Sequence, residues 1–364
     1  MAQRIHLVAA ARPNFMKVAP LWHALAAADD FAPVLVHTGQ HYDANMSADI
    51  LADLGLPDPD FHLGIGSGSH AEQTGRVMLA YGEVAAAHRP DWLVVVGDVN
   101  STVAAALVGA KLGLRTVHLE AGLRSRDRTM PEEINRIATD AVADLLWTPS
   151  PDADENLLAE GVPTTRITRV GNIMLDSFEM KRPAIEAANA PGRLGCNGRG
   201  YCVVTLHRPA NVDDPAQLGA LADCLAELQA QLPIIFPVHP RTSARLEETG
   251  LDAVLRETGV RLVEPMSYVD FMSLVAGAKA VVTDSGGIQE ETTYLGIPCL
   301  TLRETTERPI TVTQGTNRLA TAGNAAEMLR GMLNGQRPVP VRPEFWDGRT
   351  AERCVADLRR RRRF

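Results

Sequence analysis

Runs of apolar residues recur along the chain, separated by amphipathic stretches, and they predict its secondary structure. The main runs lie at residues 4–10, 32–39, 91–98, 115–122, 201–207, 232–239, 260–265, 279–285 and 297–303. Apolar residues fill these runs rather than alternate with polar ones, which is typical of strands buried on both faces of a parallel sheet. The regular alternation with helical stretches predicts an α/β protein with doubly wound parallel sheets of the Rossmann-like type.

A segment rich in Gly, Pro and Ala interrupts this order at residues 181–199 and, because it lacks apolar periodicity, predicts a linker. We therefore expect an N-terminal Rossmann-like domain over residues 1–180, a C-terminal one over residues 200–348, and an active site in the cleft between them. The length of 364 residues agrees with two domains. The helical stretch at residues 349–364 fits either domain.

Composition excludes several classes of protein. Hydrophobic residues make up 45% of the chain and charged residues 22%, as in a globular protein with an ample core. No long uninterrupted apolar window predicts a membrane span, and the N-terminal run predicts a strand rather than a signal peptide. The five cysteines form no CxxC pair and no metal-ligand spacing, so we expect a cytoplasmic protein without a metal. The net charge of −8 argues against nucleic acid as a partner.

Chemically active residues gather where the predicted strands end, which is where ligands bind in open α/β sheets. These residues are Arg12, His37, Asp98, Glu120, Asn172, His207, Arg208, His239, Glu264, Asp284, Ser285 and Arg303. The abundance of acids, histidines and arginines predicts an anionic ligand and acid–base chemistry.

The clearest phosphate signal is TDSGGIQEE at residues 283–291. Ser285, Gly286 and Gly287 follow a buried strand and precede a helix, so free N–H groups and the helix dipole favour a phosphate there. The alternative is an ordinary turn in which Ser285 caps the helix. Glu291, one helical turn beyond, is placed to accept two hydrogen bonds from a ribose diol.

A second candidate anion site is AARPNFMK, in which Arg12 and Lys17 flank the start of a helix. The alternative is a solvent-facing loop with incidental basic residues. No GxGxxG follows the first strand, which argues against a nicotinamide or flavin dehydrogenase, and the absence of GxxxxGK[ST] excludes a P-loop ATPase.

Nine motifs together resemble, in order and spacing, the non-hydrolysing UDP-N-acetylglucosamine 2-epimerases. They are RPNFMKVAPL near the start, GDVNST (97–102), HLEAGLRS (118–125), MPEEINR (130–136), VGNIMLD (170–176), TLHRP (205–209), PVHPRT (237–242), TDSGGIQEET (283–292) and TERPIT (306–311). The resemblance implies a GT-B-like pair of Rossmann domains, with the C-terminal helix packed back on the first, and a homodimer. It implies interconversion of UDP-GlcNAc and UDP-ManNAc in polysaccharide biosynthesis, without a cofactor or a metal.

The same resemblance implies a mechanism and a set of site residues. UDP is eliminated across C1–C2 to give 2-acetamidoglucal and is then added back with the opposite C2 configuration. The catalytic residues implied are Asp98, Glu120, Glu132 and His207. The residues implied to bind the UDP-sugar are Arg12, Lys17, Phe271 (against the uracil), Ser285, Gly286, Gly287, Glu291 (on the ribose) and Arg308, to which the strand-end position of His239 adds a further contact. Glu133 and Arg136 are interpreted instead as structural partners on their helix.

Three departures from the family pattern keep alternatives open. AARP replaces GTRP, HRPAN has Ala210 where the HRxEN form has glutamate, and TGQHYDANMS (38–47) is closer to members that act on diacetamido-glucuronate sugars. The exact sugar, allosteric activation by UDP-GlcNAc, and the choice of base and acid among the carboxylates therefore stay open. A hydrolysing epimerase, a GT-B glycosyltransferase and a nucleotide-sugar sensor are the competing functions.

Overall fold

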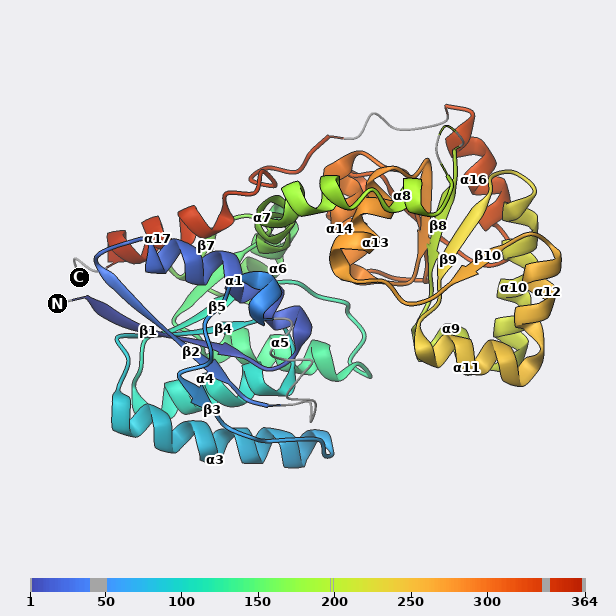
Figure 1. Ribbon diagram of the computed structural model, residues 1–364. Coiled ribbons are helices and arrows are strands. Elements are labelled where there is room, and N and C mark those ends of the chain that lie inside the picture. Colours follow the sequence, from blue (N-terminus) through green and yellow to red (C-terminus); the bar gives the residue numbers. More distant parts are fainter. Residues whose placement is uncertain (1, 40–50, 197, 199, 336–340, 362–364) are drawn as a thin grey trace. The chain divides into compact units, whose positions relative to one another are not determined.

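The computed structural model describes residues 2–39, 51–196, 198, 200–335 and 341–361, and for Arg12 the backbone alone. The chain forms two compact units, each with its own sheet. The first comprises Met1–Glu179 together with Glu344–Phe364, and the second comprises Met180–Pro343 (Figure 1).

The first unit is built on a parallel sheet of seven strands in the order β3-β2-β1-β4-β5-β6-β7. Its strands are β1 (Gln3–Ala9), β2 (Phe31–His37), β3 (Phe61–His62), β4 (Trp92–Val96), β5 (Thr116–Leu119), β6 (Leu145–Thr148) and β7 (Ile167–Arg169). Every residue of β4 and β5 is buried, because helices cover both faces of a doubly wound sheet.

Helices connect these strands and cover the sheet. They are α1 (Arg12–Ala26), α3 (His70–His88), α4 (Asn100–Leu112), α5 (Pro131–Val142), α6 (Pro151–Ala159), η1 (Thr164–Arg166), α7 (Ile173–Ala188) and α17 (Thr350–Arg361). In Figure 1, α3 and α4 lie on one face of the sheet and α1 and α17 on the other.

The C-terminal helix α17 belongs to the first unit, where it packs against α1. Asp176 of α7 accepts hydrogen bonds from the backbone N–H groups of Thr350 and Ala351, at 3.1 and 2.8 Å, and so caps the start of α17. Trp147 Nε1 donates to Asp357 at 2.8 Å, in the middle of the helix. The last helix is therefore held at both its start and its centre.

The second unit contains a parallel sheet of six strands in the order β10-β9-β8-β11-β12-β13. Its strands are β8 (Cys202–Thr205), β9 (Ile234–Pro237), β10 (Arg261–Val263), β11 (Ala280–Thr283), β12 (Cys299–Leu302) and β13 (Asn317–Ala320). Its helices are α8 (Ala190–Arg193), α9 (Pro209–Val212), α10 (Pro215–Gln229), α11 (Pro240–Thr249), α12 (Leu251–Glu257), α13 (Tyr268–Ala276), α14 (Gly286–Leu295), α15 (Ile310–Thr313) and α16 (Ala325–Leu333). The two parallel sheets confirm the predicted α/β fold with two Rossmann-like domains.

The predicted linker at residues 181–199 is mostly helical, because α7 continues to Ala188 and α8 follows it. The boundary between the units falls inside α7. The Ala-rich sequence has high helix propensity, and Ile185 and Ala190 are buried, which supplies the packing that the absence of periodicity did not reveal. The segment predicted as a linker is therefore helical in its first part.

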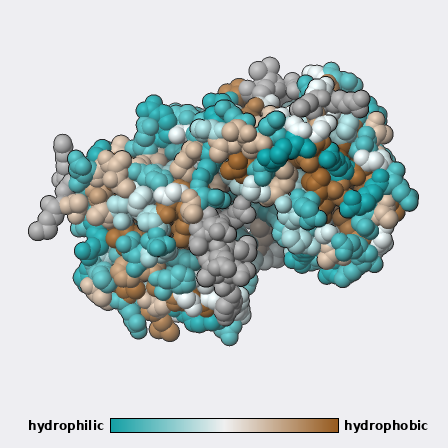
Figure 2. Space-filling view, in the orientation of Figure 1, coloured by the Kyte–Doolittle hydropathy of each residue, from teal (hydrophilic) through white to brown (hydrophobic). Residues whose placement is uncertain are grey.

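The surface seen in Figure 2 is mostly hydrophilic, with hydrophobic residues in small groups. Within the described ranges, no helix is both long enough and apolar enough to span a membrane.

The packing of α17 can be tested at Leu358, which is fully buried. We expect Leu358→Ala to lower the free energy of unfolding by about 2–5 kcal/mol, because it leaves a cavity under the helix. Leu79→Ala, at a side chain that is 75% exposed, is the matched control and should change it little. Urea unfolding measures both, and equal effects of the two variants would contradict the packing described.

Candidate active site

In the first unit, a lysine of helix α1 forms an ion pair with a glutamate at the carboxyl end of β5. Lys17 of α1 forms an ion pair with Glu120, which directly follows β5, and both side chains are almost fully buried. Gly97, at the end of β4, has a φ of +71°, and a Cβ there would lie 3.2 Å from Lys17 Nζ. A glycine at this turn therefore leaves room for the cation beside the carboxylate.

Glu120 occupies a strained backbone conformation. Its φ of +74° lies in the left-handed region, which side chains other than glycine seldom adopt. The backbone N–H groups of Glu120 and Ala121 both donate to the carbonyl oxygen of Trp147, at 3.1 and 3.0 Å, and hold this turn in place. Strain of this kind is common at functional sites, where the surrounding structure maintains it.

Asp98 follows β4 and is held by two residues of α5. Arg136 forms an ion pair with the Asp98 carboxylate, and Asn135 Nδ2 donates to the Asp98 carbonyl oxygen at 2.8 Å. Arg136 also donates to the Glu120 carbonyl oxygen at 3.5 Å. One arginine thus contacts both turns that carry the predicted catalytic acids.

The structure corrects the interpretation of Glu133 and Arg136 as partners within one helix. Glu133 is buried and accepts hydrogen bonds from the backbone N–H groups of Ser125 and Arg126, at 2.7 and 3.1 Å. Arg136 reaches across to Asp98 instead. Charge spacing along a helix does not distinguish a partner on the same helix from one on a neighbouring strand. Glu132 is exposed in the first turn of α5.

The second unit has a buried carboxylate between β8 and β11, where the strand order reverses. Asp284 is fully buried and accepts hydrogen bonds from the backbone N–H groups of His207 and Arg208, at 3.0 and 2.9 Å. Its side chain also lies 3.0 Å from His207 Nδ1 and 3.1 Å from Asn211 Nδ2. Burial alone would raise the pKa of Asp284, but the hydrogen bonds and charge of His207 hold it below its ordinary value. Asp284 therefore orients the His207 ring.

The predicted phosphate turn begins helix α14. Ser285 occupies the N-cap position, but its side chain makes no capping hydrogen bond, which argues against the alternative of an ordinary serine cap. A Cβ at Gly286 would lie 2.6 Å from Arg308 Nη1, so the glycine allows the guanidinium to approach the turn. Arg308 is held there by Glu290 at 2.9 Å. The structure thus brings Ser285, Gly286 and Arg308 together.

Two further pairs lie in the same unit. Tyr268 of α13 donates to Glu291 at 2.7 Å, and burial raises the pKa of the Glu291 carboxyl to about 7. Phe271 is half-buried on the same helix as Tyr268.

The rings of His207 and His239 lie 5.8 Å apart. Burial lowers the pKa of His239, and the charge of His207 lowers it further.

Three arginines surround Glu307, a cluster that the sequence did not predict. Arg303, Arg308 and Arg208 approach the Glu307 carboxylate to 2.9, 3.6 and 3.7 Å. Burial would raise the pKa of Glu307, but the charges of Arg308 and Arg303 hold it far below its ordinary value. The one sequence feature that pointed toward this cluster was the position of Arg303 at the end of a predicted strand. Glu307, together with Glu290 on Arg308, therefore lets three cations lie close together beside the phosphate turn.

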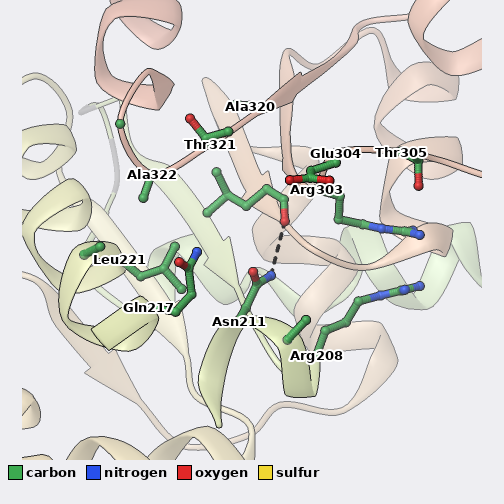
Figure 3. Close-up of a pocket in the computed structure, with 14 residues that line it drawn as sticks. Arg208, Asn211, Gln217, Leu221, Arg303, Glu304, Thr305, Ala320, Thr321 and Ala322 are labelled. Atoms are coloured by element: carbon green, nitrogen blue, oxygen red, sulfur yellow. Dashed lines mark hydrogen bonds between the residues drawn. The ribbon is translucent and has the colours of Figure 1, made fainter. Parts of the chain in front are cut away.

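A cavity of about 630 Å³ lies next to this cluster, at the ends of β12 and β13. Figure 3 shows Asn211 reaching from α9 to the Leu302 carbonyl oxygen, a hydrogen bond of 3.2 Å. Ala210, which replaces the family glutamate, lines this cavity. The small side chain therefore leaves space where the common pattern would place a carboxylate.

The structure also limits what can be said of other predicted residues. The side chain of Arg12 and most of the TGQHYDANMS motif, residues 40–47, lie outside the described residues. No group of His, Cys, Asp and Glu side chains suited to a metal ion occurs among the residues that the structure describes.

Known proteins similar to this chain are nucleotide-sugar epimerases. A family model described as UDP-N-acetylglucosamine 2-epimerase matches residues 23–359. A UDP-N-acetylglucosamine 2-epimerase of Methanocaldococcus jannaschii is 38% identical over 366 residues, which cover 98% of this chain and 98% of the relative. A UDP-2,3-diacetamido-2,3-dideoxy-D-glucuronate 2-epimerase of Pseudomonas aeruginosa is 38% identical over 330 residues, or 90% of each chain.

The fold is also found in solved structures. The crystal structure of the Methanocaldococcus jannaschii UDP-GlcNAc 2-epimerase in complex with UDP-GlcNAc and UDP is similar, with a TM-score of 0.86 and 37% sequence identity. The match covers 98% of this chain and 99% of that chain. The likeness therefore extends over both sheets.

The environment of Glu291 predicts a pH dependence of stability. Its pKa is raised from 4.5 to about 7, mainly by burial, so folding favours the protonated carboxyl. The resulting stabilisation is fully present below the unfolded-state pKa and is lost as the pH rises through about 7. Glu291→Gln cannot ionise, so its free energy of unfolding should rise by about 3 kcal/mol relative to that of the unsubstituted protein between about pH 4.5 and about pH 8.

Urea unfolding at the two pH values measures this difference. Glu257→Gln is the matched control, because Glu257 is an exposed glutamate of the same unit. Its difference from the unsubstituted protein should not depend on pH. A pH-independent difference for Glu291→Gln would mean that the carboxyl ionises normally in the folded state.

Proposed function

This chain belongs to the UDP-N-acetylglucosamine 2-epimerase family, and from that premise we propose that it interconverts UDP-GlcNAc and UDP-ManNAc without net hydrolysis. The proton at C2 of the sugar is not acidified by a neighbouring carbonyl group, so direct deprotonation and reprotonation is not accessible. UDP is instead eliminated from C1 as the C2 proton is removed, which gives 2-acetamidoglucal. Re-addition of UDP and a proton then yields the C2 epimer.

The observation that carries this proposal is the pair of carboxylates in the first unit, each bound to a cation. Glu120 pairs with Lys17, and Asp98 pairs with Arg136, at the ends of the adjacent strands β4 and β5. Elimination and re-addition need one group that removes a proton and one that returns it. Two carboxylates on adjacent turns supply both, and in this proposal the more exposed Glu132 assists them.

The second unit supplies the groups for the departing diphosphate. The N-terminus of α14 at Ser285 and Gly286, with Arg308 beside it, favours a bound phosphate. His207, oriented by Asp284, donates to the oxygen that leaves C1. We assign Glu291 to the ribose, Gly287 to the phosphate turn, and Phe271 and His239 to further substrate contacts.

A diacetamido-glucuronate sugar is a second candidate substrate, because one similar protein is named for it. The Pseudomonas aeruginosa protein, named for UDP-2,3-diacetamido-2,3-dideoxy-D-glucuronate, is as similar in sequence as the Methanocaldococcus jannaschii epimerase. Elimination across C1–C2 is chemically possible for both sugars. The family resemblance also predicts a cytoplasmic homodimer that serves polysaccharide biosynthesis, and these points stay predictions.

The proposal is tested by incubation of the protein with UDP-GlcNAc, and separately with the diacetamido-glucuronate analogue, in deuterated water. We expect deuterium at C2 of an intact UDP-sugar, followed by NMR. Release of free ManNAc with UDP would establish a hydrolysing epimerase instead. Absence of exchange with both sugars would contradict the proposal.

The role of Asp98 gives a sharper prediction. Asp98→Asn should lower the rate of C2 exchange by a factor of about 100 or more, because a proton-transfer group is lost. The dissociation constant for UDP, measured by calorimetry, should stay nearly unchanged, because Asp98 is not among the residues predicted to contact UDP. Equal losses of UDP affinity and of exchange would mean that Asp98 has a structural role.

The phosphate turn is tested by Gly286→Ala. The added Cβ would lie 2.6 Å from Arg308 Nη1 and must displace the guanidinium. We expect the UDP affinity to fall about 10-fold, the effect of losing one charge-assisted hydrogen bond. Gly219→Ala is the control, because a Cβ there meets nothing within 4 Å. Unchanged UDP affinity in Gly286→Ala would exclude Arg308 from the phosphate site.

A further inference from the structure

His118 of β5 is fully buried and lies between two hydrogen-bond acceptors. Its Nδ1 is 2.6 Å from Asp140 Oδ1 of α5, and its Nε2 is 2.8 Å from the carbonyl oxygen of Gly97. A carbonyl oxygen can only accept a hydrogen bond, so Nε2 must carry a proton. The state of Nδ1 therefore depends on whether Asp140 is ionised.

Asp140 has the surroundings of an ionised carboxylate. Arg124 Nη1 lies 2.8 Å from its Oδ2, and the backbone N–H of Gly122 donates to the same oxygen at 3.1 Å. Burial alone would raise the pKa of Asp140, but the charges and hydrogen bonds of His118 and Arg124 keep it below its ordinary value. An ionised Asp140 accepts, so Nδ1 of His118 also carries a proton.

The ion pairs around Asp140 also favour a cationic histidine. Arg124 makes a bidentate ion pair with Glu160, at 2.8 and 2.7 Å. Two carboxylates, Asp140 and Glu160, then face one arginine and His118. The residues of the neighbouring strands beside His118 are Val95 and Leu146, which are uncharged. A neutral His118 would leave one ring nitrogen with a lone pair facing an acceptor in a buried site.

We propose that His118 is a positioning residue, a buried imidazolium that together with Asp140 fixes the turn at Gly97 and Asp98 relative to the turn at Glu120. His118 holds the carbonyl oxygen that immediately precedes Asp98, and Asp140 holds the backbone at Gly122, just beyond Glu120. The imidazolium and its carboxylate thus join the two turns that carry the carboxylates. The catalytic consequence rests on the proposed function, whereas the protonation state does not.

The protonation state is measured directly by NMR on the full chain labelled with ¹⁵N-histidine. We expect both ring nitrogens of His118 to carry a proton at neutral pH, because each of them faces a hydrogen-bond acceptor. Loss of the signals in His118→Gln assigns them. One unprotonated ring nitrogen at neutral pH would overturn the inference, whatever the activity of the protein.

The consequence for catalysis is tested by Asp140→Asn, which removes the counter-charge. We expect the C2 exchange rate to approach that of the unsubstituted protein at low pH and to fall as the pH rises. At about pH 8.5 the loss should reach a factor of about 100, the effect of a misplaced catalytic group. UDP affinity should be unchanged. Asp144→Asn, at an exposed aspartate two residues beyond α5 whose carboxylate accepts from Thr116 N–H at 2.8 Å, is the control.

The outcomes separate the two proposals. A loss of exchange in Asp140→Asn that is the same at every pH would mean a merely structural role and would overturn the positioning of Asp98 by His118. Absence of exchange in the unsubstituted protein with both sugars would contradict the proposed function. The NMR result would then still decide the charge of His118.

Discussion

A carboxylate at the end of a buried strand needs a partner that offsets the cost of burying its charge, and Lys17 is that partner for Glu120. The remaining features of the N-terminal site follow from that pair. Gly97 has a positive φ and leaves room beside the cation, and Glu120 has a positive φ at the turn that carries the carboxylate. The doubly wound sheet makes this possible, because it aligns the carboxyl ends of neighbouring strands at one edge.

In the second unit the roles of the charges are reversed, because buried carboxylates hold cationic side chains in place. Buried carboxylates there hold the groups that face the ligand: Asp284 orients His207, Glu290 holds Arg308, and Glu307 gathers three arginines. Each acid balances part of the positive charge, which lets several cations lie close together before a diphosphate arrives. For the proposed reaction, charges held in place in this way need little rearrangement when negative charge develops on the leaving group.

The sequence predicted the fold well because the apolar runs of buried parallel strands are nearly continuous and easily recognised. Strand-end positions nominated Asp98, Glu120 and His207 as site residues, and in the structure each of them contacts an oppositely charged or ionisable partner. The partners could not be predicted, because contacts such as that of Arg136 with Asp98 join residues 38 positions apart. The helical segment at residues 181–199 was missed because its short buried face, Ile185 and Ala190, shows no period in the sequence. The contacts of His118 were also missed, because Asp140 and Gly97 lie about twenty positions away from it in the sequence.

The central claim is that the bond between C1 and the diphosphate oxygen breaks and re-forms during the reaction. It is tested most directly with UDP-GlcNAc labelled with ¹⁸O at the oxygen that bridges C1 and the β-phosphorus. The account predicts that ¹⁸O moves from the bridging position to the non-bridging β-phosphate oxygens in recovered UDP-sugar, at a rate at least comparable with epimerisation, as detected by ³¹P NMR. Epimerisation with all ¹⁸O retained in the bridging position would contradict it.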